Sequence, residues 1–234
     1  MFQFQQFSLT QENSAMKVGT DGVLLGAWTP GGEMTTKVLD VGTGTGLVAL
    51  MLAQRFRSAA IHALEVDLPS CEDARLNFEA SPWKDRLTLF DDSFQSFAGS
   101  TFHNYDLIVC NPPYFSGSIK NSCRRKAAAR HNHLLPQDEL LDGCSKILRQ
   151  NGRFSIILPF SDYEFFRVLA ARKGWYEFRR LKVRPTPHKP LKRVVSLWGK
   201  ELPGSSLSEE LVIELTRHQY SVAFQELTGD FYLK

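Results

Sequence analysis

The stretch Val38-Leu39-Asp40-Val41-Gly42-Thr43-Gly44-Thr45-Gly46-Leu47 decides the fold of this chain. A short segment of strand character runs into three glycines at alternate positions, and an amphipathic segment begins at Leu47. Glycines let a ligand approach the backbone closely, and the first turn of a helix offers free N–H groups. The stretch therefore predicts a strand, a tight turn that binds a nucleotide-like ligand, and a helix.

On both sides of this stretch, short apolar runs alternate with amphipathic segments. Runs without in/out alternation, separated by helices, are typical of a parallel sheet that is covered on both faces. The predicted strands are KVLDV, AIHALEV, RLTLF, YDLIVC and RFSIILP, and the predicted helices are GLVALMLAQRF, PSCEDARLNFEA, ELLDGCSKILRQ and DYEFFRVLAARKG. Beyond about residue 175, WYEFRRLKV and RVVSLWGK predict a hairpin-like strand pair that completes the sheet. We expect a doubly wound α/β fold.

Turn residues and caps mark the expected helix ends. Pro69 lies near the start of one predicted helix, and Pro82 lies just past its end. Asn151-Gly152 is expected to stop the predicted helix before it. Thr20 and Asp21 are expected to cap a short helix, GVLLGAW.

Composition and charge exclude several classes of protein. The 234 residues are 43% hydrophobic and 23% charged, which argues against disorder and coiled coil. The formal charge of +3 is too small to indicate a nucleic-acid partner by itself. The chain shows no signal peptide and no apolar run that would span a bilayer, so we expect a cytoplasmic protein without a membrane partner. The 4 cysteines are far apart, with no histidine at metal-ligand spacing, so we expect no metal site.

Acidic residues at the ends of three successive predicted strands add to the glycine-rich turn. Asp40 is placed to accept a hydrogen bond from a cationic or amino group held over the turn. Glu65 follows the glycines by about 20 residues, the spacing at which a carboxylate meets ribose hydroxyls. Asp92 is placed to receive an adenine amino group, with Asp91 as its solvated neighbour. S-adenosylmethionine contains an amino-acid part, a ribose and an adenine, and we therefore expect it as the cofactor.

The spacing of the glycines bears on the choice of cofactor. G-x-G-x-G departs from the G-x-G-x-x-G fingerprint of dinucleotide sites, which argues against NAD. The alternative is that the glycines only make a tight turn from strand to helix.

The tetrapeptide Asn111-Pro112-Pro113-Tyr114 directly follows the predicted strand YDLIVC. Ligands of open α/β sheets bind beyond the carboxyl ends of the strands, so this loop lies beside the cofactor turn. The Asn111 side chain and the Pro112 carbonyl can accept hydrogen bonds from one planar NH₂ group, and Tyr114 can stack on a flat substrate. When both N–H groups of this amine are hydrogen-bonded to fixed carbonyls, the nitrogen lone pair is directed toward an electrophilic methyl group. The alternative is a Pro-Pro turn without a catalytic role.

The motifs VLDVGTGTG, ALEVD, DDS and NPPY together resemble the S-adenosylmethionine-dependent N-methyltransferases that act on planar amino groups, over about residues 35–200. The run AMKVGTDGVLLGAW and the tail QELTGDFYL are similar to the bacterial tRNA adenine-N6 methyltransferase family that modifies adenosine-37 of valine tRNA. The resemblance implies a Rossmann-like class I methyltransferase fold, with a mostly parallel seven-stranded sheet and an antiparallel C-terminal strand. It also implies three parts: a cofactor-covering extension (1–34), a catalytic domain (35–200) and a C-terminal extension packed on that domain (201–234).

The resemblance also implies the roles of individual residues. The expected cofactor-binding residues are Lys17, Thr20, Asp21, Asp40, Gly42, Gly44, Gly46, Glu65 and Asp92. The expected catalytic residues, which hold the adenine, are Asn111, Pro112, Pro113 and Tyr114.

Basic residues gather in two segments of the chain. Residues 120–130 contain five basic and no acidic residues, and residues 172–200 contain ten basic residues against Glu177 alone. Both segments are placed to face a phosphate backbone, although a charge run is more often a solvated face. The expected RNA-binding residues are Arg124, Arg125, Lys126, Arg130, Lys189, Lys192 and Arg193.

These patterns together predict an enzyme, a tRNA (adenine-N6)-methyltransferase that acts as a monomer on an unstacked base. NPPY is shared with enzymes that methylate guanine N2 in ribosomal RNA or the glutamine amide of release factors, so both alternatives stay open. The non-enzymatic alternative is an RNA-binding module with an inactive methyltransferase fold.

Overall fold

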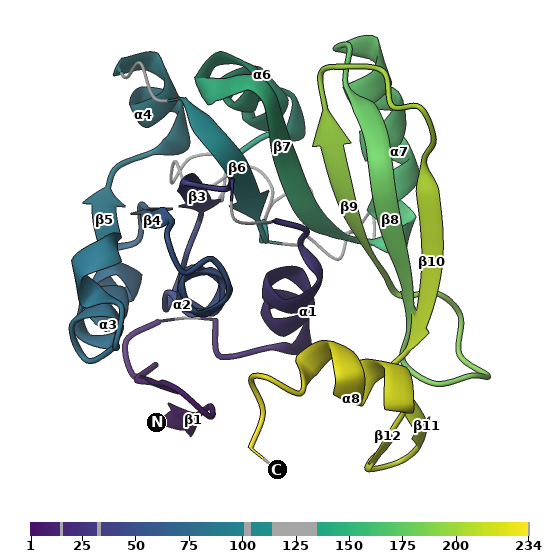
Figure 1. Ribbon diagram of the computed structural model, residues 1–234, viewed down its shortest axis with the longest axis horizontal. Helices are drawn as coiled ribbons and strands as arrows, with labels where there is room; N and C mark the ends of the chain where they lie inside the picture. The colour runs from purple at the N-terminus through teal and green to yellow at the C-terminus, as the bar shows by residue number, and fades with distance from the viewer. Residues whose placement is uncertain (15, 32–33, 101–103, 114–134, 234) are drawn as a thin grey trace, which may run out of the picture.

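A computed structural model describes residues 1–14, 16–31, 34–100, 104–113 and 135–233 of the chain (Figure 1). Among these residues, eight strands form one sheet in the order β10-β8-β9-β7-β6-β3-β4-β5. The strands are β3 Lys37–Val41, β4 Ala60–Glu65, β5 Leu87–Asp91, β6 Tyr105–Cys110, β7 Leu148–Pro159, β8 Tyr176–Arg184, β9 Arg193–Gly199 and β10 Leu207–Val212. From β7 to β5 all neighbours are parallel, and β9 is antiparallel to both β7 and β8.

The predicted doubly wound, mostly parallel α/β fold is confirmed, and β8 and β9 form the predicted hairpin. The described part of the sheet has one strand more than the predicted seven, because β10 pairs in parallel with the outer edge of β8. This pairing gives partners to edge backbone groups that would otherwise be open to association with other chains. It also brings Glu209 within 2.6 Å of Arg179 on β8.

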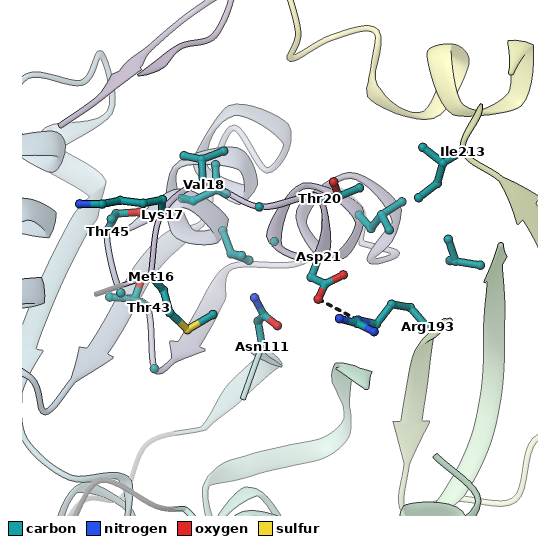
Figure 2. A pocket seen from close by; sticks show the side chains of 18 of the residues that line it. Met16, Lys17, Val18, Thr20, Asp21, Thr43, Thr45, Asn111, Arg193 and Ile213 are labelled. Carbon is teal, nitrogen blue, oxygen red and sulfur yellow. Dashed lines mark hydrogen bonds and ion pairs between the residues drawn. The ribbon is translucent and has the colours of Figure 1, made fainter. Parts of the chain in front are cut away.

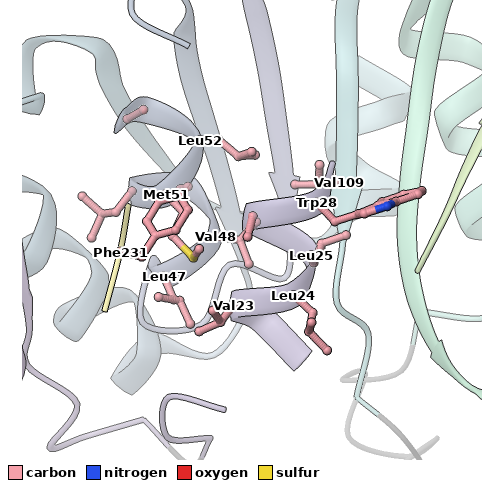
Figure 3. Close-up of a cluster of buried hydrophobic side chains, with 14 of the residues drawn as sticks. Val23, Leu24, Leu25, Trp28, Leu47, Val48, Met51, Leu52, Val109 and Phe231 are labelled. Atoms are coloured by element: carbon pink, nitrogen blue, oxygen red, sulfur yellow. The ribbon is translucent and has the colours of Figure 1, made fainter. Parts of the chain in front are cut away.

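Helices cover both faces of the sheet, as the unbroken apolar strands require. The first face carries α1 Thr20–Trp28, α2 Leu47–Arg55 and α3 Leu68–Glu79, and the second carries α4 Phe94–Ser100, α6 Gln137–Ile147 and α7 Phe160–Arg172. Gly22 and Gly26 let α1 approach α2 closely, since a Cβ on either would lie within 2.9 Å of the α2 side chains Leu47 and Met51. Figure 3 shows the resulting core between α1, α2 and the sheet.

Two expected helix ends differ from the structure. The N-cap of α1 is Gly19, without a side-chain cap, and the expected capping by Thr20 and Asp21 is wrong because both lie inside the helix. The helix before Asn151-Gly152 ends earlier than expected, at Ile147. Asn151 instead adopts a left-handed φ of 66° within β7, where the register against β6 shifts. Pro69 lies in the first turn of α3, as predicted.

The two ends of the chain pack against each other. The N-terminal hairpin is formed by β1 Phe2–Gln3 and β2 Ser8–Leu9, and the C-terminal part adds β11 Glu214–Thr216, β12 Gln219–Tyr220 and α8 Val222–Thr228. Gln5 N donates to Phe231 O at 2.8 Å, and the Phe4 ring stacks on Tyr232. Figure 1 shows α8 beside α1, on the face where Phe224 and Phe231 join the core. Phe4, Phe7 and Leu9 of the N-terminal hairpin are therefore core residues.

Candidate active site

The glycine-rich turn between β3 and α2 requires glycine for two different reasons. Gly42, Gly44 and Gly46 have φ angles of 69°, 56° and 85°, a region that other residues rarely adopt. A Cβ on Gly46 would lie 2.5 Å from Phe78, so packing also excludes a side chain there. A Cβ on Gly42 or Gly44 would meet no atom within 4 Å. These two positions leave open space beside the backbone that a ligand can approach.

Asp40 is the buried acid beneath this turn, with 1% of its surface exposed. Its Oδ2 accepts hydrogen bonds from Thr43 Oγ1 at 2.6 Å and from Ala49 N at 3.1 Å. Burial raises the pKa of Asp40 to about 7, against the lowering effect of these two bonds, and the nearby Glu65 carboxylate raises it further. Asp40 therefore gains or loses its charge near neutral pH.

Glu65 and Asp92 lie at the ends of β4 and β5, where the strand register places them at the same edge of the sheet. The Glu65 carboxylate accepts from Gly44 N at 2.8 Å, and from the backbone N–H groups of Val66 and Asp67 at 2.8 and 2.9 Å. It thus helps to hold the glycine-rich turn in place. Asp92 is half-buried, whereas Asp91 is exposed and paired with Arg75 at 2.9 Å.

A cavity of about 400 Å³ opens beside the turn (Figure 2). Three parts of the chain line it: residues 16–22, the turn with Asp40, and residues beyond the carboxyl ends of β6, β8 and β10. This placement is a consequence of topology, because β8 and β10 run parallel to β7 and end at the same edge of the sheet. Glu65 and Asp92 lie outside the lining of this cavity.

Asn111 lies directly after β6 and lines the cavity together with the glycine-rich turn. In Figure 2 its side chain points into the space between Met16 and Asp21. Pro112 is half-buried and Pro113 is exposed. Tyr114 lies outside the described residues. The predicted proximity of NPPY to the cofactor turn is thus present at Asn111.

The N-terminal residues expected near the cofactor also lie at the cavity. Lys17 is exposed and donates through Nζ to the carbonyl of Gln11, and Thr20 is exposed on the first turn of α1. The Asp21 carboxylate accepts from Arg193 Nε at 2.8 Å. One expected cofactor ligand and one expected RNA ligand are therefore paired with each other across the cavity (Figure 2).

Comparison with known proteins places the chain in a family. Residues 22–164 match the family model described as "Methyltransferase small domain". The protein named tRNA1(Val) (adenine(37)-N6)-methyltransferase of Flavobacterium psychrophilum is 42% identical, and the similarity covers 100% of both chains. Proteins of the same name from Bacteroides fragilis and Vibrio vulnificus are 43% and 41% identical over 100% of this chain and 98% and 95% of theirs. The chain belongs to this methyltransferase family.

Solved structures agree with this family at the level of the fold. The Agrobacterium tumefaciens protein Atu636, described as a predicted O-methyltransferase, has a TM-score of 0.69 and 16% identity, and covers 90% of this chain and 96% of its own. A ribosomal protein L11 methylase from Lactobacillus delbrueckii has a TM-score of 0.53 and 16% identity, with 78% of each chain covered. The fold of this family member is that of Rossmann-like class I methyltransferases.

Within the described ranges, no three His, Cys, Asp or Glu side chains gather where they could hold a metal ion. The helices of the same ranges include none that is long and apolar enough to cross a membrane.

The second basic segment, residues 172–200, has fewer unpaired positive charges than its sequence indicates. Half of its ten basic residues are paired with acids, and four of the five acids lie outside the segment. The pairs are Lys173–Asp142, Arg179–Glu209, Arg180–Glu177, Arg184–Glu210 and Arg193–Asp21. Lys189 and Lys192 have no acidic partner among the described residues, and both belong to the loop between β8 and β9. Arg124, Arg125, Lys126 and Arg130 lie outside the described residues.

The sequence predictions missed part of the cavity wall. Ile213 and Glu214 line the cavity from the end of β10. Ile213 N and Glu214 N donate to the carbonyls of Arg184 and Pro185 at 2.9 and 3.0 Å. No motif marks these residues, because their position depends on the pairing of β10 with β8, which local sequence does not reveal.

Proposed function

We propose that the chain transfers a methyl group from S-adenosylmethionine to N6 of adenosine-37 of valine tRNA. The observation that carries this proposal is that Asn111 of the NPPY motif lines the same cavity as the glycine-rich turn. A methyl donor over the turn and an amino group at Asn111 would then meet within one cavity. Relatives that match the whole chain carry the name of this activity.

The described residues fit S-adenosylmethionine at four places. Gly42 and Gly44 leave the open space that a close ligand needs. Asp40 lines the cavity, where its carboxylate would face a charged amino group. The strand ends bearing Glu65 and Asp92 lie at the same edge of the sheet, outside the cavity lining, and would face the ribose and the adenine beyond it. Residues 17–21 would cover the amino-acid end. When bound, S-adenosylmethionine supplies a methyl group on a positively charged sulfur, whose S–C bond breaks as the N6–C bond forms and an N6 proton is released.

Asn111 and Pro112 would bind the target amine. Their carbonyl oxygens would accept hydrogen bonds from both N6 N–H groups, which localises the lone pair on nitrogen and directs it toward the methyl group. Positioning of this kind needs no strong general base. Tyr114 would stack on the adenine, which must first be unstacked from its neighbours in the anticodon loop.

Labelled S-adenosylmethionine and bulk tRNA without its modifications test this proposal. After incubation and digestion to nucleosides, the label is expected in N6-methyladenosine, and mapping in valine tRNA is expected to place it at position 37. Label in ribosomal RNA or in release factor, offered in parallel, would favour a guanine-N2 or glutamine-N5 methyltransferase. If calorimetry detects no binding of S-adenosylmethionine, the result would favour the inactive RNA-binding module.

We propose that the tRNA backbone contacts the loop between β8 and β9. Lys189 and Lys192 are the unpaired cations of this loop among the described residues, and Lys192 also lines the cavity. The double change Lys189→Ala with Lys192→Ala is expected to weaken tRNA binding and to lower the log–log salt slope by roughly 1.4 to 1.8 if each lysine meets one phosphate. Filter binding over a range of salt concentrations measures this slope.

Arg172 provides the matched control for these lysines. It is exposed and has no acidic partner among the described residues, but it lies at the end of α7, at the opposite edge of the sheet. Arg172→Ala is expected to leave the slope unchanged. A similar decrease for Arg172→Ala and for the double variant would contradict a specific contact at the β8–β9 loop.

The pKa of about 7 for Asp40 predicts how cofactor affinity depends on pH. The pKa lies above the 3.8 of an ordinary aspartate, so the contribution of Asp40 to stability is present at low pH and is lost as pH rises through about 7. A positively charged amino group compensates the ionised Asp40, so we expect affinity to increase between pH 6 and 7.5. It should fall again near pH 8, where α-amino groups lose their proton, with a pKa of about 7.7–8.0.

Two variants separate the limbs of this pH profile, which calorimetry measures. Asp40→Asn is expected to remove the rising limb and to keep the falling one. Thr43→Val removes a hydrogen bond that lowers the pKa of Asp40, so the rising limb should move to higher pH. Affinity of the unchanged protein that is constant from pH 6 to 7.5 would contradict the role of Asp40.

The remaining expectations are proposals of the same kind. We propose residues 1–34 as the cofactor-covering extension, residues 35–200 as the catalytic domain and residues 201–234 as the C-terminal extension. A monomeric state and a cytoplasmic location stay predictions.

A further inference from the structure

The segment from Thr10 to Gly19 crosses α3 before it reaches the cavity. It lies between the N-terminal hairpin and α1, and its described residues, 10–14 and 16–19, belong to no helix or strand. Residues 16–19 at its end line the cavity beside the glycine-rich turn. A segment without regular structure needs other contacts to hold it in one conformation, because ordering the backbone costs about 1–2 kcal/mol per residue.

Asp73 on α3 supplies the first of these contacts. It is fully buried, and its Oδ2 accepts from Ser14 N at 2.7 Å, Ser14 Oγ at 2.7 Å and Asn13 N at 3.1 Å. Asn13 Nδ2 donates to the other carboxylate oxygen at 3.2 Å. Burial alone would raise the pKa of Asp73, but the hydrogen bonds from Ser14 and from the backbone of Asn13 and Glu12 outweigh it, and the pKa lies below its ordinary value. The carboxylate is therefore held in its charged form by this segment.

Asn77, one helical turn further along α3, joins the segment to the glycine-rich turn. Its Oδ1 accepts from Thr10 N at 2.7 Å, and its Nδ2 donates to Thr10 O and to Thr45 O, each at 2.8 Å. Thr45 belongs to the glycine-rich turn and lines the cavity. One buried amide thus fixes the start of the N-terminal segment relative to the backbone that would face the cofactor.

Gln11 closes the same segment into a loop. Its side-chain Oε1 accepts from Val18 N at 2.7 Å, and its backbone carbonyl accepts from Lys17 Nζ. The cavity-lining residues are therefore tied to the stretch that Asp73 and Asn77 hold. Asp73 and Asn77 themselves lie outside the lining of the cavity.

We infer that Asp73 and Asn77 are positioning residues for the methyl donor. They hold the loop from Thr10 to Gly19 in one conformation against the glycine-rich turn, so that the cofactor does not have to order this loop when it binds. The inference rests on the proposed function, because it takes the cavity to be the S-adenosylmethionine site. Their removal acts on cofactor affinity through the loop and leaves the amine-holding Asn111 in place.

Asp73→Asn tests this inference. We expect the Kd for S-adenosylmethionine to rise by about ten- to a hundredfold, the range for hydrogen bonds to a charged group. The kcat at saturating cofactor is expected to stay close to that of the unchanged protein. Hydrogen exchange of the cofactor-free protein is expected to speed up in residues 10–19.

Asp106 provides the matched control. It is also a buried aspartate, which accepts from Thr36 N, Thr36 Oγ1 and Lys37 N at 2.6, 2.8 and 3.0 Å and pairs with Arg149. These contacts lie at the start of β3, at the edge of the sheet opposite the cavity. Asp106→Asn is expected to lower the melting temperature to a similar extent and to leave the Kd for S-adenosylmethionine unchanged.

The outcomes separate positioning from stability. An unchanged Kd for Asp73→Asn, or an equal rise for Asp106→Asn, would overturn the inference. If Asp73→Asn does not fold, Ser14→Ala, which removes the Oγ bond alone, is expected to raise the Kd by a smaller factor, and an unchanged Kd would overturn the inference there too. The exchange measurement needs no cofactor, so it decides whether the loop is held even if the unchanged protein fails to bind S-adenosylmethionine, a result that would contradict the proposed function itself.

Discussion

Asn111→Ala is expected to lower kcat by on the order of 10²–10³-fold, the loss seen when one preorganised hydrogen-bonding group is removed from an active site. The Kd for S-adenosylmethionine is expected to stay within about twofold, because the variant loses an interaction with the amine and not with the methyl donor. The reason is geometric: Asn111 lies beyond the end of β6, whereas the glycine-rich turn follows β3. The same cavity holds both, from different strands.

Single-turnover kinetics with valine tRNA and calorimetry with S-adenosylmethionine measure the two quantities separately. Asn111→Asp keeps an acceptor oxygen near the original position, so it is expected to retain more activity than Asn111→Ala. Equal losses in kcat and in cofactor affinity would show that Asn111 supports the cofactor as well, and would contradict the proposed division of roles.

The features that sequence predicted well depend on residues close together in the chain. The apolar run at residues 107–110 of β6 and the alternation of glycines after β3 are local patterns, and both determine backbone shape within a few residues. The parallel order then follows from the helices between the strands. The cofactor turn and the NPPY loop could be placed at one edge of the sheet on these grounds alone.

The features that sequence could not predict depend on distant partners. Arg179 and Arg184 lie in a sequence segment that contains a single acidic residue, so the sequence predicts that they have no acidic partner. In the structure β10 places Glu209 and Glu210 beside them, and each arginine forms an ion pair. An edge strand pairs with whatever strand reaches it, and this choice has no local signature. The charge available for RNA is therefore smaller than the count of basic residues. Of the five basic residues of this segment that lack an acidic partner among the described residues, two, Lys189 and Lys192, lie in the β8–β9 loop.

The hydrogen bonds of Asp73 and Asn77 are a second example. Both residues occur in a helical segment of mixed polarity, where a carboxylate and an amide predict a solvated face. Their burial follows from the N-terminal segment, which crosses α3 some 60 residues away in sequence. Buried polar groups need partners, and here the partners include backbone groups of Thr10, Asn13 and Ser14, which carry no sequence signal.

Gly44→Ala is expected to raise the Kd for S-adenosylmethionine by about 10- to 100-fold, the range for a methyl group forced into a packed contact. Gly44 lines the cavity, and its added Cβ would meet no protein atom within 4 Å, so the protein itself has room for it. Only a ligand close to the backbone would be displaced. The φ of 56° is unfavourable for alanine, so the change is also expected to lower the free energy of unfolding by about 1–2 kcal/mol.

Gly174→Ala separates the backbone cost from the contact with the ligand. Gly174 also has a positive φ, of 72°, and its nearest atom to an added Cβ is Lys200 Nζ at 3.9 Å, but it lies beyond α7 and outside the cavity lining. Both variants should therefore lose similar stability in a urea titration, and only Gly44→Ala should lose cofactor affinity in calorimetry. If both keep their affinity, the open space at Gly44 is not where S-adenosylmethionine binds, and the glycines serve only the turn.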